Sequence, residues 1–174
     1  PTSAAKQVSL TELGSIKINK EERTKMYKTI PRSSVIGFLI GVLPGAGATI
    51  ASFLAYGMER NVVSDEEKEK FGKGSVNGLS APETANNAAC SGSFVPMLTL
   101  GIPGSGTTAV MLGALLGFGV QPGPRLYMTN PEIFWSIIMS MYIGMVILLI
   151  LNLPIIPDIA RILAVPKNEF IPLV

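Results

Sequence analysis

Two short segments of this chain combine proline, glycine and hydroxyl-bearing residues inside otherwise uncharged stretches. Residues 43–49 read LPGAGAT, and residues 102–108 read IPGSGTT. Proline removes a backbone hydrogen-bond donor and glycine weakens the helical state, so each segment is predicted to interrupt a helix. The helix that ends at such a break leaves free carbonyl groups, which suit a cation. The helix that begins there leaves free N–H groups and a positive dipole end, which suit a carboxylate.

The glycines and hydroxyls of these two segments are the candidate substrate-binding groups. Glycine lets a ligand approach the backbone closely, and a Ser or Thr hydroxyl either caps the new helix or reaches the ligand. A kinked helix capped by its own hydroxyl is the plain structural alternative. Two breaks in one chain favour a transport site at which the breaks meet. The predicted substrate-binding residues are Gly45, Gly47, Thr49, Gly104, Ser105, Thr107 and Thr108.

A second polar group lies in residues 80–87, which read SAPETANN. Glu83, Asn86 and Asn87 are spaced i, i+3, i+4 and therefore share one face of a helix. We expect them to line a polar cavity, in which Glu83 coordinates a cation or carries a proton and the two asparagines bind the coupling ion. For Glu83 the alternative is a capping box that begins at Ser80. For the asparagines binding is favoured, because buried amides need partners.

Composition and charge distribution indicate a polytopic membrane protein. The chain of 174 residues is 15% charged with a mean hydropathy of +0.43, whereas soluble domains are ~25% charged. Residues 33–58 and 133–157 contain no charged side chain, and residues 74–131 contain only Glu83 and Arg125. The net charge of +2 comes without a basic stripe, so no nucleic-acid partner is predicted.

The inventory of reactive side chains argues against an enzyme. The sequence has no histidine, and Cys90 is the one cysteine, so neither a metal site nor a disulfide is predicted. Glu83 is the one acid in the glycine-rich region, without a nucleophile–base pair beside it. Neither Pro-Gly segment continues into a phosphate-binding motif. No cofactor is expected.

The chain divides into a polar segment and a membrane segment. Residues 1–32 are predicted to be a basic linker on the cytoplasmic side, because positive charge beside a span favours that side. Residues 33–174 are predicted to be the membrane-embedded part. Within it, residues 35–43 and 50–58 form apolar helices that are each shorter than the ~20 residues of a span. Together they form either one broken span or a re-entrant hairpin.

The remaining segments are predicted from charge and apolar length. The charged residues 59–73 lie in water or among headgroups, and residues 133–153 form a spanning helix with Trp135 near its start. Residues 157–166 hold a short amphipathic, interfacial piece. Close helix packing is predicted for three Gly-x-x-x-Gly pairs, Gly37–Gly41, Gly74–Gly78 and Gly113–Gly117.

Several motifs together are distinctive. They are GVLPGAGATIASFLAY at residues 41–56, FGKG at 71–74, APE at 81–83, ANNAA at 85–89, LTLGIPGS at 98–105 and QPGP at 121–124. With these motifs the chain resembles the large permease subunit of tripartite tricarboxylate transporters, the TctA type, over about residues 30–166. Thr84, Cys90 and Gly106 stand where the resemblance leads us to expect alanine or another small residue.

The resemblance implies a many-span protein of the bacterial inner membrane. Such a permease works with a small membrane subunit and a periplasmic solute-binding protein, and imports carboxylates such as citrate with a cation gradient, commonly of sodium. It also implies a two-repeat transporter, of which this chain is the start of the second half. The chain starts without methionine and ends in an apolar run, as expected of a segment of a longer protein. The alternatives are a structural membrane scaffold and a channel.

Overall fold

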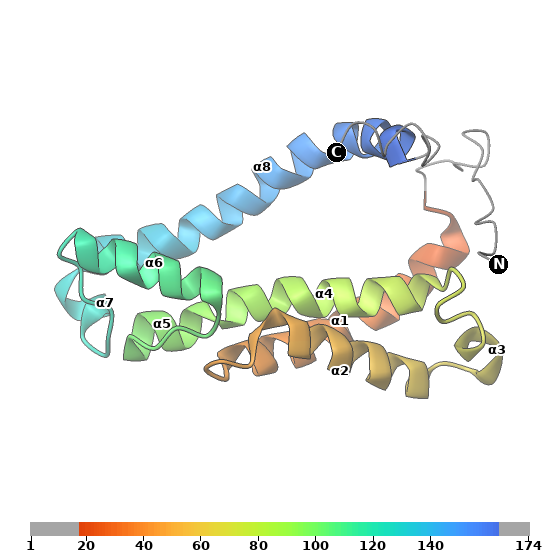
Figure 1. The fold of residues 1–174 in the computed structure, drawn as a ribbon, viewed down its shortest axis with the longest axis horizontal. Helices are drawn as coiled ribbons and strands as arrows, with labels where there is room; N and C mark the ends of the chain where they lie inside the picture. The colour runs from red at the N-terminus through yellow and green to blue at the C-terminus, as the bar shows by residue number, and fades with distance from the viewer. Residues whose placement is uncertain (1–17, 164–174) are drawn as a thin grey trace, which may run out of the picture. The chain divides into compact units, whose positions relative to one another are not determined.

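The computed structural model describes residues 18–163, which form helices joined by turns (Figure 1). The helices are α1 (Lys20–Val42), α2 (Gly47–Val62), α3 (Asp65–Lys68), α4 (Val76–Gly92), α5 (Phe94–Leu100), α6 (Gly106–Gly117), α7 (Leu126–Thr129) and α8 (Pro131–Leu163). The chain separates into two compact units. One is Asn19–Trp135, and the described part of the other is residues 136–163. The candidate site residues all belong to the first unit.

Helix α1 begins much earlier than the predicted apolar helix of residues 35–43. Asn19 and Glu22 form a reciprocal capping box, in which each side chain accepts a hydrogen bond of 2.8 Å from the other residue's backbone N–H. This cap starts the helix inside the polar segment, and Pro31 does not end it. One helix therefore crosses the predicted boundary at residue 32. Residues 1–17 of the predicted linker lie outside the described range.

Helices α1 and α4 run parallel with their backbones in contact. A Cβ atom added to Gly37 would lie 2.6 Å from Ala85 Cα, and one added to Gly41 would lie 2.6 Å from Ala89 Cα. Glycine at these positions is what permits the approach. The close packing predicted for the Gly37–Gly41 pair is thus confirmed. Residues in register repeat every four positions: Thr29, Ser33, Gly37 and Gly41 are buried on α1, and Asn77, Ala81, Ala85 and Ala89 on α4.

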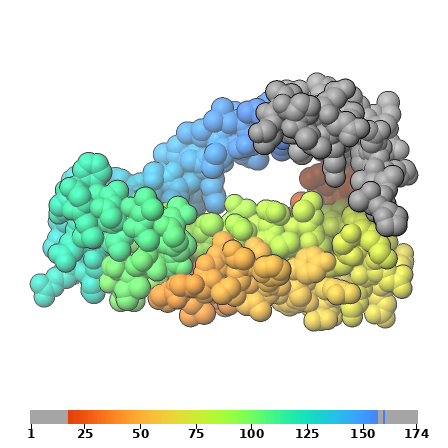
Figure 2. Space-filling model, viewed as in Figure 1, coloured from red at the N-terminus to blue at the C-terminus, as the bar shows by residue number. Residues whose placement is uncertain are grey.

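Helix α2 runs back beside α1 and α4 and closes the three-helix core. It buries one residue every four positions, Ala51, Ala55 and Glu59. The two alanines form one apolar cluster with Ala85 and Ala89 of α4. Figure 2 shows the atoms of α2 and α4 in continuous contact. The core therefore consists of small side chains at one end and a buried carboxylate at the other.

The other two Gly-x-x-x-Gly pairs bring no two helix backbones together among the residues that the structure describes. Gly74 has φ +100° and lies in the turn before α4, so the predicted helical pairing of Gly74 with Gly78 is wrong. A Cβ atom on Gly78 would lie 3.2 Å from Cδ1 of Phe71, whose ring also meets the Tyr56 ring edge-on. Gly113 and Gly117 have nothing within 4 Å of an added Cβ among the described residues. For this last pair, close packing stays a prediction.

Helix α8 is the one described helix that is long and apolar enough to cross a membrane, judged by length and composition. Its segment Pro131–Ile156 has a mean hydropathy of 2.4 and contains the predicted span of residues 133–153. The helix continues without a break to Leu163, so residues 157–163 do not form a separate piece. Residues 164–166 of the predicted amphipathic segment lie outside the described range.

Replacing Gly37 by valine tests the contact between α1 and α4. The added side chain has no room against the Ala85 backbone, so we expect a loss of roughly 1–3 kcal/mol in unfolding free energy. Gly57→Val is the matched control, because Gly57 is helical and has nothing within 4 Å of an added Cβ. Thermal unfolding of the full-length protein measures both. Equal losses in the two variants would contradict the packing described.

Candidate functional site

The first Pro-Gly segment forms the turn of a helical hairpin. Helix α1 ends at Val42, and the Ala46 N–H donates to the Leu43 carbonyl oxygen across the turn at 3.2 Å. Gly45 has φ +80° and Gly47 has φ +69°, in the left-handed region that favours glycine. The sequence left open one broken span or a re-entrant hairpin; in the structure α1 and α2 fold back on each other as a helical hairpin, and re-entry into the membrane stays a prediction.

Helix α2 begins at this turn without a side-chain cap. Its N-cap residue is Ala46, which offers no oxygen to the first N–H groups, and the described residues supply no side-chain acceptor in its place. The first N–H groups of a helix have no partner within the helix. They also carry the positive end of its dipole. The Thr49 hydroxyl lies in this first turn and is exposed. The start of α2 can therefore accept a carboxylate.

The second Pro-Gly segment is capped by its own side chains. Helix α5 ends at Leu100 with Gly101 in the left-handed conformation at φ +70°, and α6 begins at Gly106. Ser105 and Thr108 form a capping box: the Ser105 N–H donates to Thr108 Oγ1 at 2.8 Å, and the Thr108 N–H donates to Ser105 Oγ at 3.3 Å. Capping, the plain alternative considered from the sequence, thus occupies these two hydroxyls. Thr107 is exposed.

The two Pro-Gly segments lie close to each other. A Cβ atom added to Gly104 would lie 2.8 Å from Ser93 Cβ and 3.2 Å from the carbonyl oxygen of Gly41, which is three residues before Pro44. The start of α6 is thereby held beside the end of α1. Gly104 is itself buried, so its function in this arrangement is packing. The exposed candidates at the junction are Gly45, Thr49 and Thr107.

The predicted capping box at Ser80 and Glu83 is wrong. Helix α4 begins at Val76, one turn earlier, because the Ser75 hydroxyl accepts the Gly78 N–H at 3.0 Å. Ser80 is instead a buried residue inside the helix. Glu83 is exposed and does not cap the helix, which was the structural alternative considered for it.

The Glu83 face of α4 is exposed within this unit. Asn86 and Asn87 are also exposed, so the expectation of buried amides is wrong for the described chain. The Asn86 side chain donates to Ser52 Oγ of α2 at 3.4 Å, and the Asn87 side chain donates to the Glu83 carbonyl oxygen at 2.9 Å. The three side chains share one face, as the spacing predicted. This polar face borders α2.

An ion pair that was not predicted from the sequence joins the middle of α1 to the C-terminal part of α2, between the partly exposed Arg32 and the buried Glu59. Glu59 is fully buried, and the Arg32 guanidinium binds its carboxylate through Nε at 3.0 Å and through Nη2 at 2.8 Å. Thr29 donates to Glu59 Oε1 at 2.8 Å, and the Asn77 amide donates to the same oxygen at 3.2 Å. All three helices of the core thus converge on one carboxylate. The expectation that all of residues 59–73 lie in water or headgroups is wrong at Glu59.

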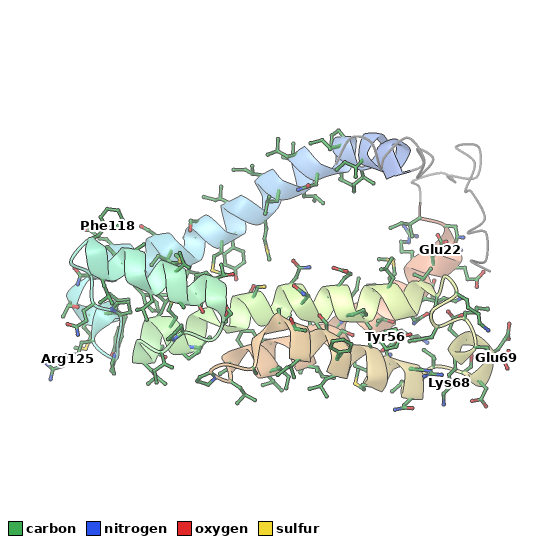
Figure 3. The ribbon with its side chains drawn as sticks, in the orientation of Figure 1. Glu22, Tyr56, Lys68, Glu69, Phe118 and Arg125 are labelled. Atoms are coloured by element: carbon green, nitrogen blue, oxygen red, sulfur yellow. The ribbon has the colours of Figure 1, made fainter. Side chains whose placement is uncertain are left out.

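A second missed network fixes α3 to the start of α1. Lys25 donates to Glu67 Oε2 at 3.1 Å, and Ser75 donates to Glu67 Oε1 at 2.9 Å. Partial burial raises the pKa of Glu67, but the Lys25 and Ser75 hydrogen bonds outweigh it and the pKa is lowered. The pKa of Lys25 is raised by its hydrogen bonds to Glu21 and Glu67. Figure 3 labels Lys68 and Glu69 at this end of the unit.

A four-residue repeat in the sequence is the signal that predicts the missed cluster. Thr29 and Ser33 continue the spacing of Gly37 and Gly41 on α1, as Glu59 continues that of Ala51 and Ala55 on α2. Small or short polar residues at every fourth position mark a closely packed helix face. Continuing the four-residue spacing from Gly37 toward the start of α1, and from Ala55 toward the end of α2, identifies the buried polar residues Thr29, Ser33 and Glu59.

The described residues form helices joined by turns, and one of these helices is long and apolar enough to cross a membrane, which is consistent with a membrane protein. The chain belongs to the tripartite tricarboxylate transporter TctA family, whose model matches residues 2–174. Proteins of this family are membrane-transporter subunits and not enzymes. Two relatives come from Agrobacterium vitis, and no solved structure matches.

The two relatives are described as uncharacterized proteins. One, of 52.8 kDa, is encoded in the TAR-I ttuC' 3' region and is 38% identical over 96% of this chain and 33% of its own length. The other, in the TAR-II ttuC' 3' region, is 44% identical over 78% of this chain and 55% of its own length. The chain therefore spans between a third and about half of these relatives.

Removing the Arg32 side chain tests the buried ion pair. Arg32→Leu leaves the Glu59 carboxylate buried without its counter-charge, for which we expect a loss of about 3 kcal/mol in unfolding free energy. Arg60→Leu is the matched control, because Arg60 is an exposed cation on the same hairpin. Denaturation of the full-length protein compares them. If the Arg32 variant were as stable as the Arg60 variant, the carboxylate would not depend on Arg32.

Proposed function

We propose that this chain forms part of the permease subunit of a tripartite transporter that imports tricarboxylates or related carboxylates across the bacterial inner membrane. Membership of the TctA family supports the transporter class. The observation that carries the substrate class is the uncapped start of α2, in the turn that follows the end of α1 against which Gly104 packs. A helix start with free N–H groups binds anions in many unrelated proteins.

In this proposal the α1–α2 hairpin enters the membrane without crossing it. Its arms, residues 33–42 and 47–58, are free of charge and reach roughly 15–18 Å at about 1.5 Å per residue. That is about half of the ~30 Å hydrocarbon core. The Arg32–Glu59 pair lies at the base of the arms, and the basic residues before Arg32 favour the cytoplasmic side. The turn at Pro44 then lies near the middle of the bilayer.

The substrate carboxylate is held at that turn. The N–H groups at Gly47 and Ala48 and the hydroxyl of Thr49 bind it from α2, and the Thr107 hydroxyl faces it from α6. Gly45 provides the left-handed turn that presents these groups. Gly104, Ser105 and Thr108 hold the second segment in place through packing and capping. The site thus divides into exposed binding groups and buried supporting groups.

The proposed transport cycle needs a coupling ion and two partners. We take sodium as the ion, and the exposed face of Glu83, Asn86 and Asn87 as the lining of the polar route that substrate or ion follows. A small membrane subunit completes the membrane part, and a periplasmic solute-binding protein delivers the carboxylate. The tripartite organisation of the TctA family supports these partners.

Uptake of labelled citrate tests the proposal in the full-length parent reconstituted with its partners, with and without an inward sodium gradient. We expect Thr49→Val to raise KM about tenfold, the effect of losing one hydrogen bond to a charged group. Gly45→Ala strains the turn and is expected to lower uptake strongly. The controls are Thr99→Val, at an exposed threonine in α5, and Gly106→Ala, at a glycine in open space.

Three results would contradict the proposal. Normal uptake by the Thr49 and Gly45 variants would remove the turn from the binding site. Loss of stability with unchanged substrate affinity would indicate a structural scaffold. Entry that only equilibrates, without accumulation against a gradient, would indicate a channel. A panel of dicarboxylates and tricarboxylates in the same vesicles identifies the substrate if citrate is not accumulated.

A further inference from the structure

Three buried oxygen atoms at the Glu59 end of the three-helix core have no hydrogen-bond partner in the described chain. They are Ser33 Oγ, Asn77 Oδ1 and Ser80 Oγ. Ser33 is fully buried, and Asn77 and Ser80 are 6% and 9% exposed. Buried polar atoms are almost always paired, and each unpaired one destabilises the fold. An occupant that interacts with all three would remove this cost.

The helix register places the residues that carry these atoms within about one helical turn of each other on α1 and α4. Thr29 of α1 and Asn77 of α4 are joined by a hydrogen bond of 2.8 Å. Ser33 is one turn beyond Thr29, and Ser80 is one turn beyond Asn77 on the parallel helix. Side chains on a helix lean toward its N-terminus, so both serine hydroxyls lean back toward the level of this pair.

The Asn77 amide cannot turn over to satisfy its own oxygen. Its nitrogen donates to Thr29 Oγ1 and to Glu59 Oε1. Exchanging nitrogen and oxygen would direct the amide oxygen at the negatively charged Glu59 carboxylate. The unpaired Oδ1 is therefore fixed on the side away from Glu59, where it needs a partner that attracts oxygen.

The chemistry of the three unpaired oxygen atoms favours a small monovalent cation. The unpaired groups are one amide oxygen and two hydroxyls, and hard oxygen ligands suit alkali and alkaline-earth ions. Arg32 already balances the Glu59 charge, so this end of the core lacks the excess negative charge that would favour a divalent ion. We propose that Ser33, Asn77 and Ser80 bind one sodium ion beside the Arg32–Glu59 pair.

This site is distinct from the exposed face of Glu83, Asn86 and Asn87, which has access to solvent in this unit. The assignment of the buried ion as the one that drives import rests on the proposed function. The proposed binding does not, because it is argued from the unpaired atoms and the helix register. Binding and coupling therefore have separate measurements.

Thermal unfolding of the purified full-length protein in sodium chloride or choline chloride, at equal ionic strength, measures the binding. A ligand that binds the folded state alone raises the unfolding temperature, so we expect sodium to stabilise the protein relative to choline. Ser80→Ala and Ser33→Ala are each expected to raise the half-saturating sodium concentration about tenfold, through loss of one ligand. In choline both variants should be at least as stable as the parent, because an unpaired hydroxyl has been removed.

Ser91→Ala is the matched control on α4, since Ser91 is only half-buried and its hydroxyl donates to the Asn87 carbonyl oxygen of its own helix. It should keep the parent's response to sodium. Equal stability of the parent in both salts would overturn the proposal. An ordered water would then be the partner of the three oxygen atoms. A full sodium response in both serine variants would also overturn it, by locating the ion elsewhere. Sodium-independent uptake, with the sodium response lost in the Ser80 variant, would support the site while contradicting sodium coupling in the proposed function.

Discussion

The direct backbone contact between α1 and α4 is the constraint on which the rest of this unit depends. Gly37 and Gly41 leave no space for a side chain against Ala85 and Ala89, which fixes the two helices in one parallel register. That register aligns Thr29 with Asn77 at one end. At the other end, the C-terminal end of α1 lies against the second Pro-Gly segment. The geometry of the Glu59 cluster and that of the two Pro-Gly turns therefore both depend on the contact between the small residues of α1 and α4.

The two ends of this stripe differ in how their polar groups are satisfied. At the base, Glu59 is surrounded by donors from α1 and α4, which fastens the hairpin arms to each other and to α4. At the turn, α2 starts without a cap, whereas α6 is closed by Ser105 and Thr108. In the proposed function, the hydrogen-bonded base and the uncapped helix start preorganise the anion site, because the groups that bind are held before the ligand arrives.

Local sequence chemistry predicted the parts of this structure that depend on neighbouring residues. Proline and glycine located both turns, and the apolar length of residues 133–153 located the body of α8. The Gly37–Gly41 spacing identified a packing face. The partner residues on α4 are 48 positions away in the sequence, so only the folded structure identifies them. The burial of Glu59 escaped prediction because it continues an alanine stripe with a charged residue. The cap at Ser80 failed because Ser75 offered an equivalent cap one turn earlier.

The most direct test of the account is the side of the membrane on which the two ends of the α1–α2 hairpin lie. Lys20→Cys and Glu66→Cys, each made in full-length protein without other cysteines, place one thiol at the first residue of α1 and one after α2. A membrane-impermeant thiol reagent is then applied to right-side-out and inside-out vesicles. The account predicts that both thiols are labelled from the same side. Labelling from opposite sides would contradict it, because the hairpin would then be a broken helix that crosses the membrane.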